Sequence, residues 1–213
     1  TNHEPIRGRD MLPLFQETSL SVVPMVNPDG VNLVLKGASA AEHLEEEVLE
    51  INQQSEDFSN WKANIRGVDL NNQFPALWEI EADRKPSEPS PRDYPGPAPL
   101  SEPESIAMAE LTNERMFQRV NAFHTQGAEI YWGFEGLEPP ISETIVNEYA
   151  RVSGYKPVRY LDSYAGYKDW FIYEFQRPGF TMELGRGVNP LPIDQYPTIY
   201  EESLGILLAN LYL

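Results

Sequence analysis

The sequence contains no cysteine among its 213 residues, and only three of the residues are histidine. Disulfide bonds are therefore excluded, and any metal site would have to use histidine, aspartate or glutamate side chains. Basic side chains are also few, because 16 lysines and arginines face 33 aspartates and glutamates. The resulting formal net charge of −17 repels nucleic acids and anionic membranes, so we expect neither as a partner.

Long apolar runs are missing as well. The C-terminal run Leu204–Leu213 is about half the length that a membrane-spanning helix needs. No signal peptide is visible, and the chain begins with Thr1 instead of methionine, so we expect a processed or incomplete piece of a protein. The lack of cysteine suits the bacterial cytoplasm and exported bacterial proteins equally, so the sequence leaves the compartment open.

The residues that are present indicate a globular protein. Hydrophobic residues make up 41% of the chain, which is long enough for one domain, residues 1–213, with a sizeable core. Alternating strands and helices predict an α/β fold with a mixed, mostly parallel sheet flanked by helices. The expected strands are Leu20–Val26, Gln118–His124, Ala128–Gly133 and Gly179–Leu184. The expected helices are Ile6–Gln16, Ala40–Asn52, Ser101–Phe117, Ile141–Gly154 and Tyr200–Leu211.

Local signals refine these elements. We expect Phe15 to turn inward from the first helix, and the β-rich run Leu20–Val26 to be a buried parallel strand that ends in an Asn-Pro-Asp-Gly turn. Ser142 can cap the helix that Gly154 ends. The proline-rich stretch Arg84–Pro103 predicts a long irregular loop, and loops of this length often line a site.

One helix carries a possible metal pair. His43 and Glu46 lie three residues apart in the acidic helix Ala40–Asn52, which would place both on one helical face. The surrounding run is rich in glutamate, so an accidental match is the better interpretation and we expect the helix to face solvent.

Two ionisable residues at strand ends are candidates for chemistry. His124 follows an apolar run and precedes a small polar turn, where it could present a neutral imidazole to a metal or substrate, or be a half-buried structural histidine. Glu183 lies inside the apolar strand Gly179–Leu184, where burial would raise its pKa and make it a general base. The alternative is a structural glutamate paired with Arg186.

Other polar groups could bind substrate. Asn71 and Asn72 follow an apolar run, where their amides could hold a peptide carboxylate or carbonyl, or form a turn. Lys62 and Arg66 could stabilise an oxyanion or be ordinary surface charges. The tyrosine-rich segment 162–170 could move and deliver a phenol to a bound peptide, or be a packed loop.

Several motifs in a fixed order resemble the zinc carboxypeptidase family. They are Asn27-Pro-Asp-Gly, Gly67-Val-Asp-Leu-Asn-Asn-Gln-Phe, His124-Thr-Gln-Gly and Phe180-Thr-Met-Glu-Leu. The chain is most similar to a bacterial branch, the γ-D-glutamyl-L-diamino acid endopeptidases, which cut peptidoglycan stem peptides. That similarity includes Trp61-Lys-Ala-Asn, Tyr94-Pro-Gly-Pro-Ala-Pro-Leu-Ser-Glu-Pro-Glu, Ala165-Gly-Tyr-Lys-Asp-Trp-Phe and Asn189-Pro-Leu-Pro.

The resemblance implies a role for each candidate. His124 resembles the third zinc ligand, and Glu183 resembles the general base that activates a zinc-bound water. The oxyanion-stabilising cation is Lys62, with Arg66 as the alternative. Asn71 matches the substrate-binding asparagine. The mobile tyrosine corresponds to Tyr164, with Tyr167 as the alternative. The implied activity is zinc-dependent hydrolysis of a peptide, with a stem peptide of peptidoglycan as substrate.

Two departures from the family pattern affect these expectations. The family's other zinc ligands form an upstream His-x-x-Glu, whereas only His3 precedes Asn27 here and its sequence context lacks the glutamate. We therefore expect a catalytic domain whose N-terminal part is missing; a non-catalytic binding module is the alternative, and a replacement metal pair at His43 and Glu46 is a weaker one. Asn72 stands where ordinary carboxypeptidases have an arginine, which favours an unusual peptide with a D-centre.

Overall fold

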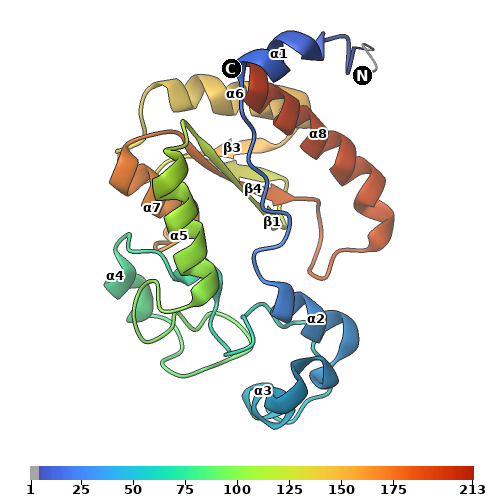
Figure 1. The fold of residues 1–213 in the computed structure, drawn as a ribbon, viewed down its shortest axis with the longest axis vertical. Coiled ribbons are helices and arrows are strands. Elements are labelled where there is room, and N and C mark those ends of the chain that lie inside the picture. The colour runs from blue at the N-terminus through green and yellow to red at the C-terminus, as the bar shows by residue number, and fades with distance from the viewer. Residues whose placement is uncertain (1–4) are drawn as a thin grey trace.

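The structure is a computed structural model and describes residues 5–213, so His3 lies outside the described residues. Its helices are α1 (Met11–Glu17), α2 (Pro28–Lys36), α3 (Glu45–Ile51), α4 (Trp78–Ala82), α5 (Pro103–Arg115), α6 (Ile141–Ser153), α7 (Tyr167–Phe175) and α8 (Tyr196–Tyr212) (Figure 1). Three short 3-10 helices are η1 (Ala38–Leu44), η2 (Leu70–Asn72) and η3 (Ile193–Gln195). The strands are β1 (Val120–Thr125), β2 (Glu129–Tyr131), β3 (Lys156–Val158) and β4 (Gly179–Leu184).

The strands form one four-stranded sheet in the order β1-β4-β2-β3. The β1–β4 and β2–β3 pairs are parallel, and the β2–β4 pair is antiparallel. The expected mixed, mostly parallel sheet flanked by helices is therefore confirmed. Strand β4 lies inside the sheet, so the residues at its carboxyl end have a neighbouring strand on each side.

Helices cover the sheet on both faces. On one face, Phe180 and Met182 of β4 belong to a core cluster with Ile145 and Tyr149 of α6 and with Ile206 of α8. Helix α7 packs against β1 and β4, and Figure 1 shows α5 and α7 on the side of the sheet away from α6 and α8. Alternate side chains of a strand point to opposite faces, so Glu183 points away from the face that holds Phe180 and Met182.

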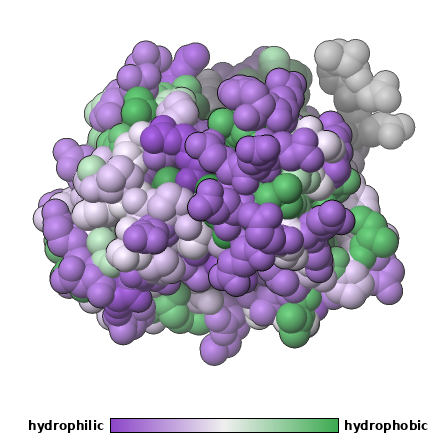
Figure 2. Space-filling model, turned by 90° about the horizontal axis from the view of Figure 1, so that it is seen from below, coloured by the Kyte–Doolittle hydropathy of each residue, from purple (hydrophilic) through white to green (hydrophobic). Residues whose placement is uncertain are grey.

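A separate cluster joins the first helices. Leu33, Val48, Phe58, Trp61 and Ala63 are buried together beneath α2, η1 and α3. Figure 2 shows the lower end of the molecule, near α3, as mostly hydrophilic with scattered hydrophobic side chains. Within the described part of the chain, no helix is both long enough and apolar enough to span a membrane.

Strand β4 was predicted with its observed bounds, and β1, β2, α5 and α6 lie within three residues of prediction at each end. The stretch 84–102 is irregular, as expected. Helix α8 begins four residues earlier than predicted. The predicted helix Ala40–Asn52 is instead divided between the 3-10 helix η1 and the α-helix α3, and Glu42 inside η1 has a non-helical backbone with φ of 54°.

The sequence interpretation missed β3 and the helices α2, α4 and α7. Helix α7 begins inside the segment predicted to be a loop, where the Asp169 carboxylate accepts a hydrogen bond from the Gly166 amide at 3.0 Å. An aspartate three residues after a glycine is a helix-start signal that the tyrosines on either side obscured. Strand β3 has three residues, one of them Pro157, and is too short for a clear strand pattern.

Four other expectations were wrong. Leu20–Val26 forms no strand, and its side chains are exposed. Phe15 is 84% exposed and does not turn inward. Asn27 does not end a strand: it caps α2, because its side-chain oxygen accepts a hydrogen bond from the Gly30 amide at 2.9 Å. Pro140 is the residue before α6, so Ser142 is not its cap.

Candidate active site

Three ionisable side chains lie in a row across three neighbouring strands. His124 of β1 is directly opposite Glu183 of β4, and Glu129 of β2 is directly opposite Glu183 on its other side. Directly opposed residues project from the same face of a sheet and are close enough to interact. The strand register therefore joins His124 and Glu183, which are 59 positions apart in the sequence, into one candidate site.

His124 is held in the neutral form. Its imidazole is half-buried, and burial lowers its pKa from 6.5 to about 4. Burial is the largest cause of this shift; the ammonium of Lys62 contributes in the same direction, and the carboxylate of Asp69 opposes it. A neutral imidazole has a free lone pair at neutral pH, which is the form that binds a metal ion.

The pKa of Glu183 is shifted in the opposite direction, upward. Burial raises the pKa of its carboxyl group from 4.5 to about 7, the Lys62 ammonium opposes the shift, and the Glu129 carboxylate adds to it. The alternative partner Arg186 instead forms an ion pair with Glu202 at 3.5 Å. Glu183 therefore combines partial burial with a pKa near neutrality, which suits a general base, and this role stays a prediction.

Lys62 is the predicted cation that acts on this row. Its ammonium lies 2.8 Å from Asp69 and lowers the pKa of both His124 and Glu183. Arg66 is 59% exposed on its side chain and approaches Glu102 at 3.6 Å. The Arg66 charge is not among the causes of either shift. Of the two candidate cations, the structure therefore favours Lys62.

Asp69 is a residue that sequence reasoning did not assign to the site. It is buried, and besides binding Lys62 it accepts hydrogen bonds from the backbone amides of Asn71 at 3.1 Å and Asp93 at 3.0 Å. One carboxylate thus positions the cation, the asparagine turn and the proline-rich loop. The sequence did contain a sign of this role, because in Gly67-Val-Asp an acidic residue directly follows an apolar one, and an acid in an apolar setting needs a partner.

The two neighbouring asparagines have different surroundings. Asn72 is 2% exposed, and its amide nitrogen lies 3.4 Å from the Asp93 carbonyl oxygen. Asn71 is half-buried and lies next to Gly166. Its side-chain oxygen is close enough that a Cβ atom added to Gly166 would lie 3.7 Å from it. Asn71 therefore faces the tyrosine-rich segment, whereas Asn72 lies under the proline-rich loop. The geometry favours Asn71 as the substrate-binding residue, and both roles stay predictions.

These surroundings predict separable effects of two alanine substitutions. Asn72→Ala should lower the free energy of unfolding by about 1 kcal/mol, because it removes a partly buried hydrogen bond to the Asp93 carbonyl. Asn71→Ala should leave stability unchanged and raise KM for a peptide substrate. Urea unfolding and steady-state kinetics of the active polypeptide that contains this chain test both expectations. The opposite pattern would make Asn72 the substrate-binding residue.

The tyrosine-rich segment is anchored in the structure. The Phe74 amide donates to the Ala165 carbonyl at 3.0 Å, and the Ala165 amide donates to the Ala76 carbonyl at 2.9 Å. The Tyr167 hydroxyl is bound to Thr112 of α5 at 2.8 Å. Tyr164 packs edge-on against Phe134, at 6.0 Å between ring centroids.

Tyr164 also contributes to a surface pocket of about 460 Å³, lined by residues 133–136 and 160–162 together with Tyr164 itself. Tyr167 has its hydroxyl engaged with α5 and does not line this pocket. Of the two predicted tyrosines, Tyr164 therefore has the more open position. Its role as a mobile substrate-binding phenol stays a prediction.

Glu129 and Tyr131 are further residues that sequence reasoning missed. The Tyr131 hydroxyl donates to the Glu129 carboxylate at 3.1 Å, and Lys156 of β3 lies 3.2 Å from the same carboxylate. These contacts fix Glu129 beside Glu183. The alternation of Glu129 and Tyr131 with the buried Ile130 was the available signal, because it places both polar side chains on one face.

The donor set present does not complete a zinc site. Residues 5–213 contain no group of three histidines, aspartates or glutamates placed to hold one metal ion. A catalytic zinc site uses three protein ligands, and the predicted ligand His124 would be one of the three. His43, on η1, and Glu46, on α3, belong to no such group either.

The sheet, its flanking helices and the polar row at the carboxyl end of β4 define an α/β protein with the elements of a hydrolytic site. The chain belongs to the zinc carboxypeptidase family, whose model matches residues 7–204. The resemblance inferred from the motifs is therefore confirmed, because the matched region includes every motif on which it rested.

Two relatives align with almost the whole chain. Gamma-D-glutamyl-L-diamino acid endopeptidase 1 of Lysinibacillus sphaericus is 62% identical over 213 residues, which are 100% of this chain and 54% of that protein. The uncharacterized protein YqgT of Bacillus subtilis is 52% identical over 212 residues, which are 99% of this chain and 56% of that protein. The chain thus spans about half the length of the curated relatives it matches.

The crystal structure of carboxypeptidase A from Helicoverpa armigera is similar in fold. It aligns with a TM-score of 0.54 over 89% of this chain and 50% of the insect protein, at 17% sequence identity. At that identity the likeness concerns the fold, and it agrees with the sheet and helix arrangement seen in Figure 1.

Proposed function

We propose that this chain supplies part of the active site of a zinc peptidase that hydrolyses the γ-D-glutamyl–diaminopimelate bond of peptidoglycan stem peptides. The observation that carries the proposal is 62% identity, over every residue of the chain, to a protein named as a γ-D-glutamyl-L-diamino acid endopeptidase. The in-register pair of His124 and Glu183 supports it, because hydrolysis needs a general base beside the reacting centre.

The residues present can perform proton transfer and charge stabilisation. Glu183, with its pKa raised to about 7, takes a proton from an attacking water and returns it to the leaving amine. Lys62, positioned by Asp69, stabilises negative charge that develops on the carbonyl oxygen. Asn71 orients the peptide through its amide. Among the described residues, His124 is the one that this proposal assigns as a zinc ligand.

The peptide recognised by this site is expected to be cationic or zwitterionic. The chain carries a net charge of −17, which favours such ligands over anions. A diamino acid has a second amino group, which is consistent with that preference. Asn72 in place of an arginine is consistent with a substrate other than an ordinary L-peptide with a free C-terminus.

A second candidate is a non-catalytic binding module of the same fold. The observation in its favour is that the described residues contain no group of three metal ligands. The two candidates differ in whether a bound peptide is cut. If the peptidase proposal holds, the natural polypeptide that contains this chain should hydrolyse a γ-D-glutamyl–diaminopimelate peptide and release a product that contains diaminopimelate. Binding of the same peptide without product would identify the module.

Zinc titration of the 213-residue chain tests the role of His124. We expect weak binding that the His124→Ala substitution removes, because one imidazole cannot replace a set of three ligands. The matched control is His43→Ala, which should leave binding unchanged. Calorimetry under competition with a chelator provides the readout. Tight binding that His43→Ala abolishes would assign the metal to the acidic helix and contradict the role given to His124.

A further inference from the structure

The polar row of the candidate active site continues across the whole described sheet. Beyond Glu183 of β4 the register places Glu129 of β2, and Glu129 is in turn directly opposite Lys156 of β3. With His124 of β1, each of the four strands contributes one ionisable residue to this line. His124 and Glu183 form one half of the line. Glu129 and Lys156, which have no part in proton transfer or in charge stabilisation at the carbonyl, form the other half.

Glu129 and Lys156 form an oriented ion pair. The Lys156 ammonium lies 3.2 Å from one carboxylate oxygen of Glu129, and the Lys156 side chain is 74% exposed. The other carboxylate oxygen accepts a hydrogen bond from the Tyr131 hydroxyl at 3.1 Å. Burial, followed by this hydrogen bond, raises the pKa of Tyr131 to about 12, so the phenol keeps its proton and orients Glu129. An ionised carboxylate has about four lone-pair sites, so Glu129 can accept further hydrogen bonds.

The turn between β1 and β2 leaves both carboxylates of the row open. Gly127 in this turn lies beside them, because a Cβ atom added to it would lie 3.7 Å from the Cβ of Glu183 and 3.9 Å from the Cγ of Glu129. Glycine at this position therefore places no side chain over either residue. The ion pair itself is a poor stabiliser of the fold, because water competes for an exposed charge.

The chemistry of Glu183 indicates which part of a substrate lies over this pair. A general base that returns its proton to the leaving amine must lie beside the leaving nitrogen. The metal-binding candidate His124 occupies one side of Glu183, so the amine product extends over the other side, toward β2 and β3. Neighbouring strands are about 4.8 Å apart, so Glu129 and Lys156 lie one and two such spacings beyond Glu183. A side chain with several methylene groups reaches that far.

We propose that Glu129 and Lys156 bind the second amino-acid centre of the diamino acid, which carries an ammonium and a carboxylate. This inference rests on the proposed function. The ammonium of that centre binds the free lone pairs of Glu129, and its carboxylate lies against the ammonium of Lys156. An oriented ion pair is complementary to a zwitterion, because each charge meets its opposite. Glu129 and Lys156 are therefore specificity-determining residues for the diamino acid.

Three peptides that differ by one group test the proposal. In them γ-D-glutamate is joined to diaminopimelate, to aminopimelate, which lacks the second ammonium, or to lysine, which lacks the second carboxylate. The natural polypeptide that contains this chain, loaded with zinc, should have kcat/KM at least about tenfold higher on the diaminopimelate peptide than on the aminopimelate peptide, because a hydrogen bond to a charged group has an effect of this size. Glu129→Gln, which keeps an oxygen acceptor for Tyr131, should bring this ratio close to one.

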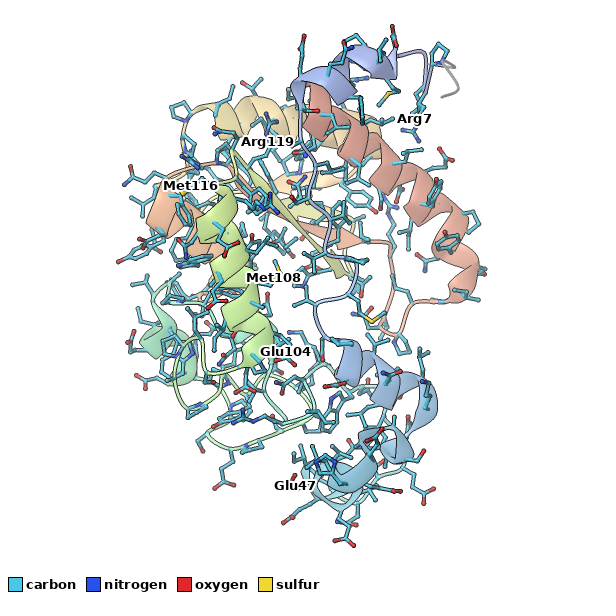
Figure 3. The ribbon with its side chains drawn as sticks, in the orientation of Figure 1. Arg7, Glu47, Glu104, Met108, Met116 and Arg119 are labelled. Atoms are coloured by element: carbon cyan, nitrogen blue, oxygen red, sulfur yellow. The ribbon has the colours of Figure 1, made fainter. Side chains whose placement is uncertain are left out.

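Lys156 has its own comparison. Lys156→Gln should remove the preference for the diaminopimelate peptide over the lysine peptide, which we expect to be about twofold to fivefold because Lys156 is exposed. The matched controls are Glu47→Gln and Lys36→Gln, at exposed positions of α3 and α2. Figure 3 shows Glu47 at the end of the molecule away from the sheet. Both controls should keep the ratios of the parent.

Equal losses of kcat/KM on all three peptides in Glu129→Gln would overturn the proposal, because a residue that is only structural, or only adjusts the pKa of Glu183, affects every peptide alike. A parent that does not distinguish diaminopimelate from aminopimelate would overturn it too. Calorimetric titration with these two free amino acids separates this proposal from the proposed function. Tighter binding of diaminopimelate, lost in Glu129→Gln, would support the site even without peptide cleavage, and equal binding of both would contradict it.

Discussion

Replacing Glu183 with glutamine is expected to lower turnover by about 10²–10⁴-fold, because removal of a general base usually has an effect of this size. Glutamine keeps the shape of the side chain but cannot accept a proton from water. The measurement is kcat on a γ-D-glutamyl–diaminopimelate peptide, made with the active polypeptide that contains these 213 residues. Zinc content, measured in the same preparation, should not change, since Glu183 is not assigned as a ligand.

A matched control for that substitution is Glu114→Gln, at an exposed position of α5. This control removes the same charge at a distance from the row of His124, Glu183 and Glu129, and should keep normal turnover. A Glu183→Gln enzyme with more than about a tenth of normal activity would contradict the general-base role. Loss of zinc from this variant would show instead that Glu183 helps to hold the metal.

Replacing Gln73 with leucine is expected to produce a large loss of stability. Gln73 is fully buried and holds the proline-rich loop: its amide nitrogen donates to the Ala98 carbonyl at 3.1 Å, and its oxygen accepts from the Ser101 and Glu102 amides at 2.9 and 3.1 Å. Leucine leaves these groups unsatisfied, and each costs about 1–3 kcal/mol. We expect the free energy of unfolding to fall by about 3 kcal/mol or more.

The control for Gln73→Leu is Gln118→Leu, at an exposed position before β1. Urea denaturation of the 213-residue chain would give the free energies of unfolding of both variants and of the parent. A change of less than about 1 kcal/mol for Gln73→Leu would show that the loop does not depend on this side chain, because a single satisfied hydrogen bond contributes about that much.

The catalytic candidates were predictable from the sequence because their chemistry conflicts with their surroundings. Glu183 is an acid in an apolar strand, and the buried strand itself gave a clear pattern. Their proximity to one another was not predictable from residue patterns alone. The parallel register that places His124 opposite Glu183, and the antiparallel register that adds Glu129, depend on strand order, which no local pattern specifies.

Other parts were missed because local signals were ambiguous. Leu20–Val26 has strand composition, but an extended apolar segment becomes a strand only when a partner supplies hydrogen bonds, and the described residues supply none. Asn71 and Asn72 are identical in type and adjacent in sequence, so only the path of the proline-rich loop distinguishes the half-buried amide of Asn71 from the buried amide of Asn72. The helix start at Gly166 was hidden among tyrosines that suggested a loop.

The most direct test of the proposed function is the identity of the bond that is cut. The natural polypeptide containing this chain, supplied with zinc, would be incubated with a γ-D-glutamyl–diaminopimelate peptide and with its α-L-glutamyl isomer, and the products would be identified by mass spectrometry. We predict cleavage of the γ-D-glutamyl bond, abolished by Glu183→Gln, and little or no cleavage of the isomer. Equal cleavage of both peptides, or binding of the first without any product, would contradict the proposal.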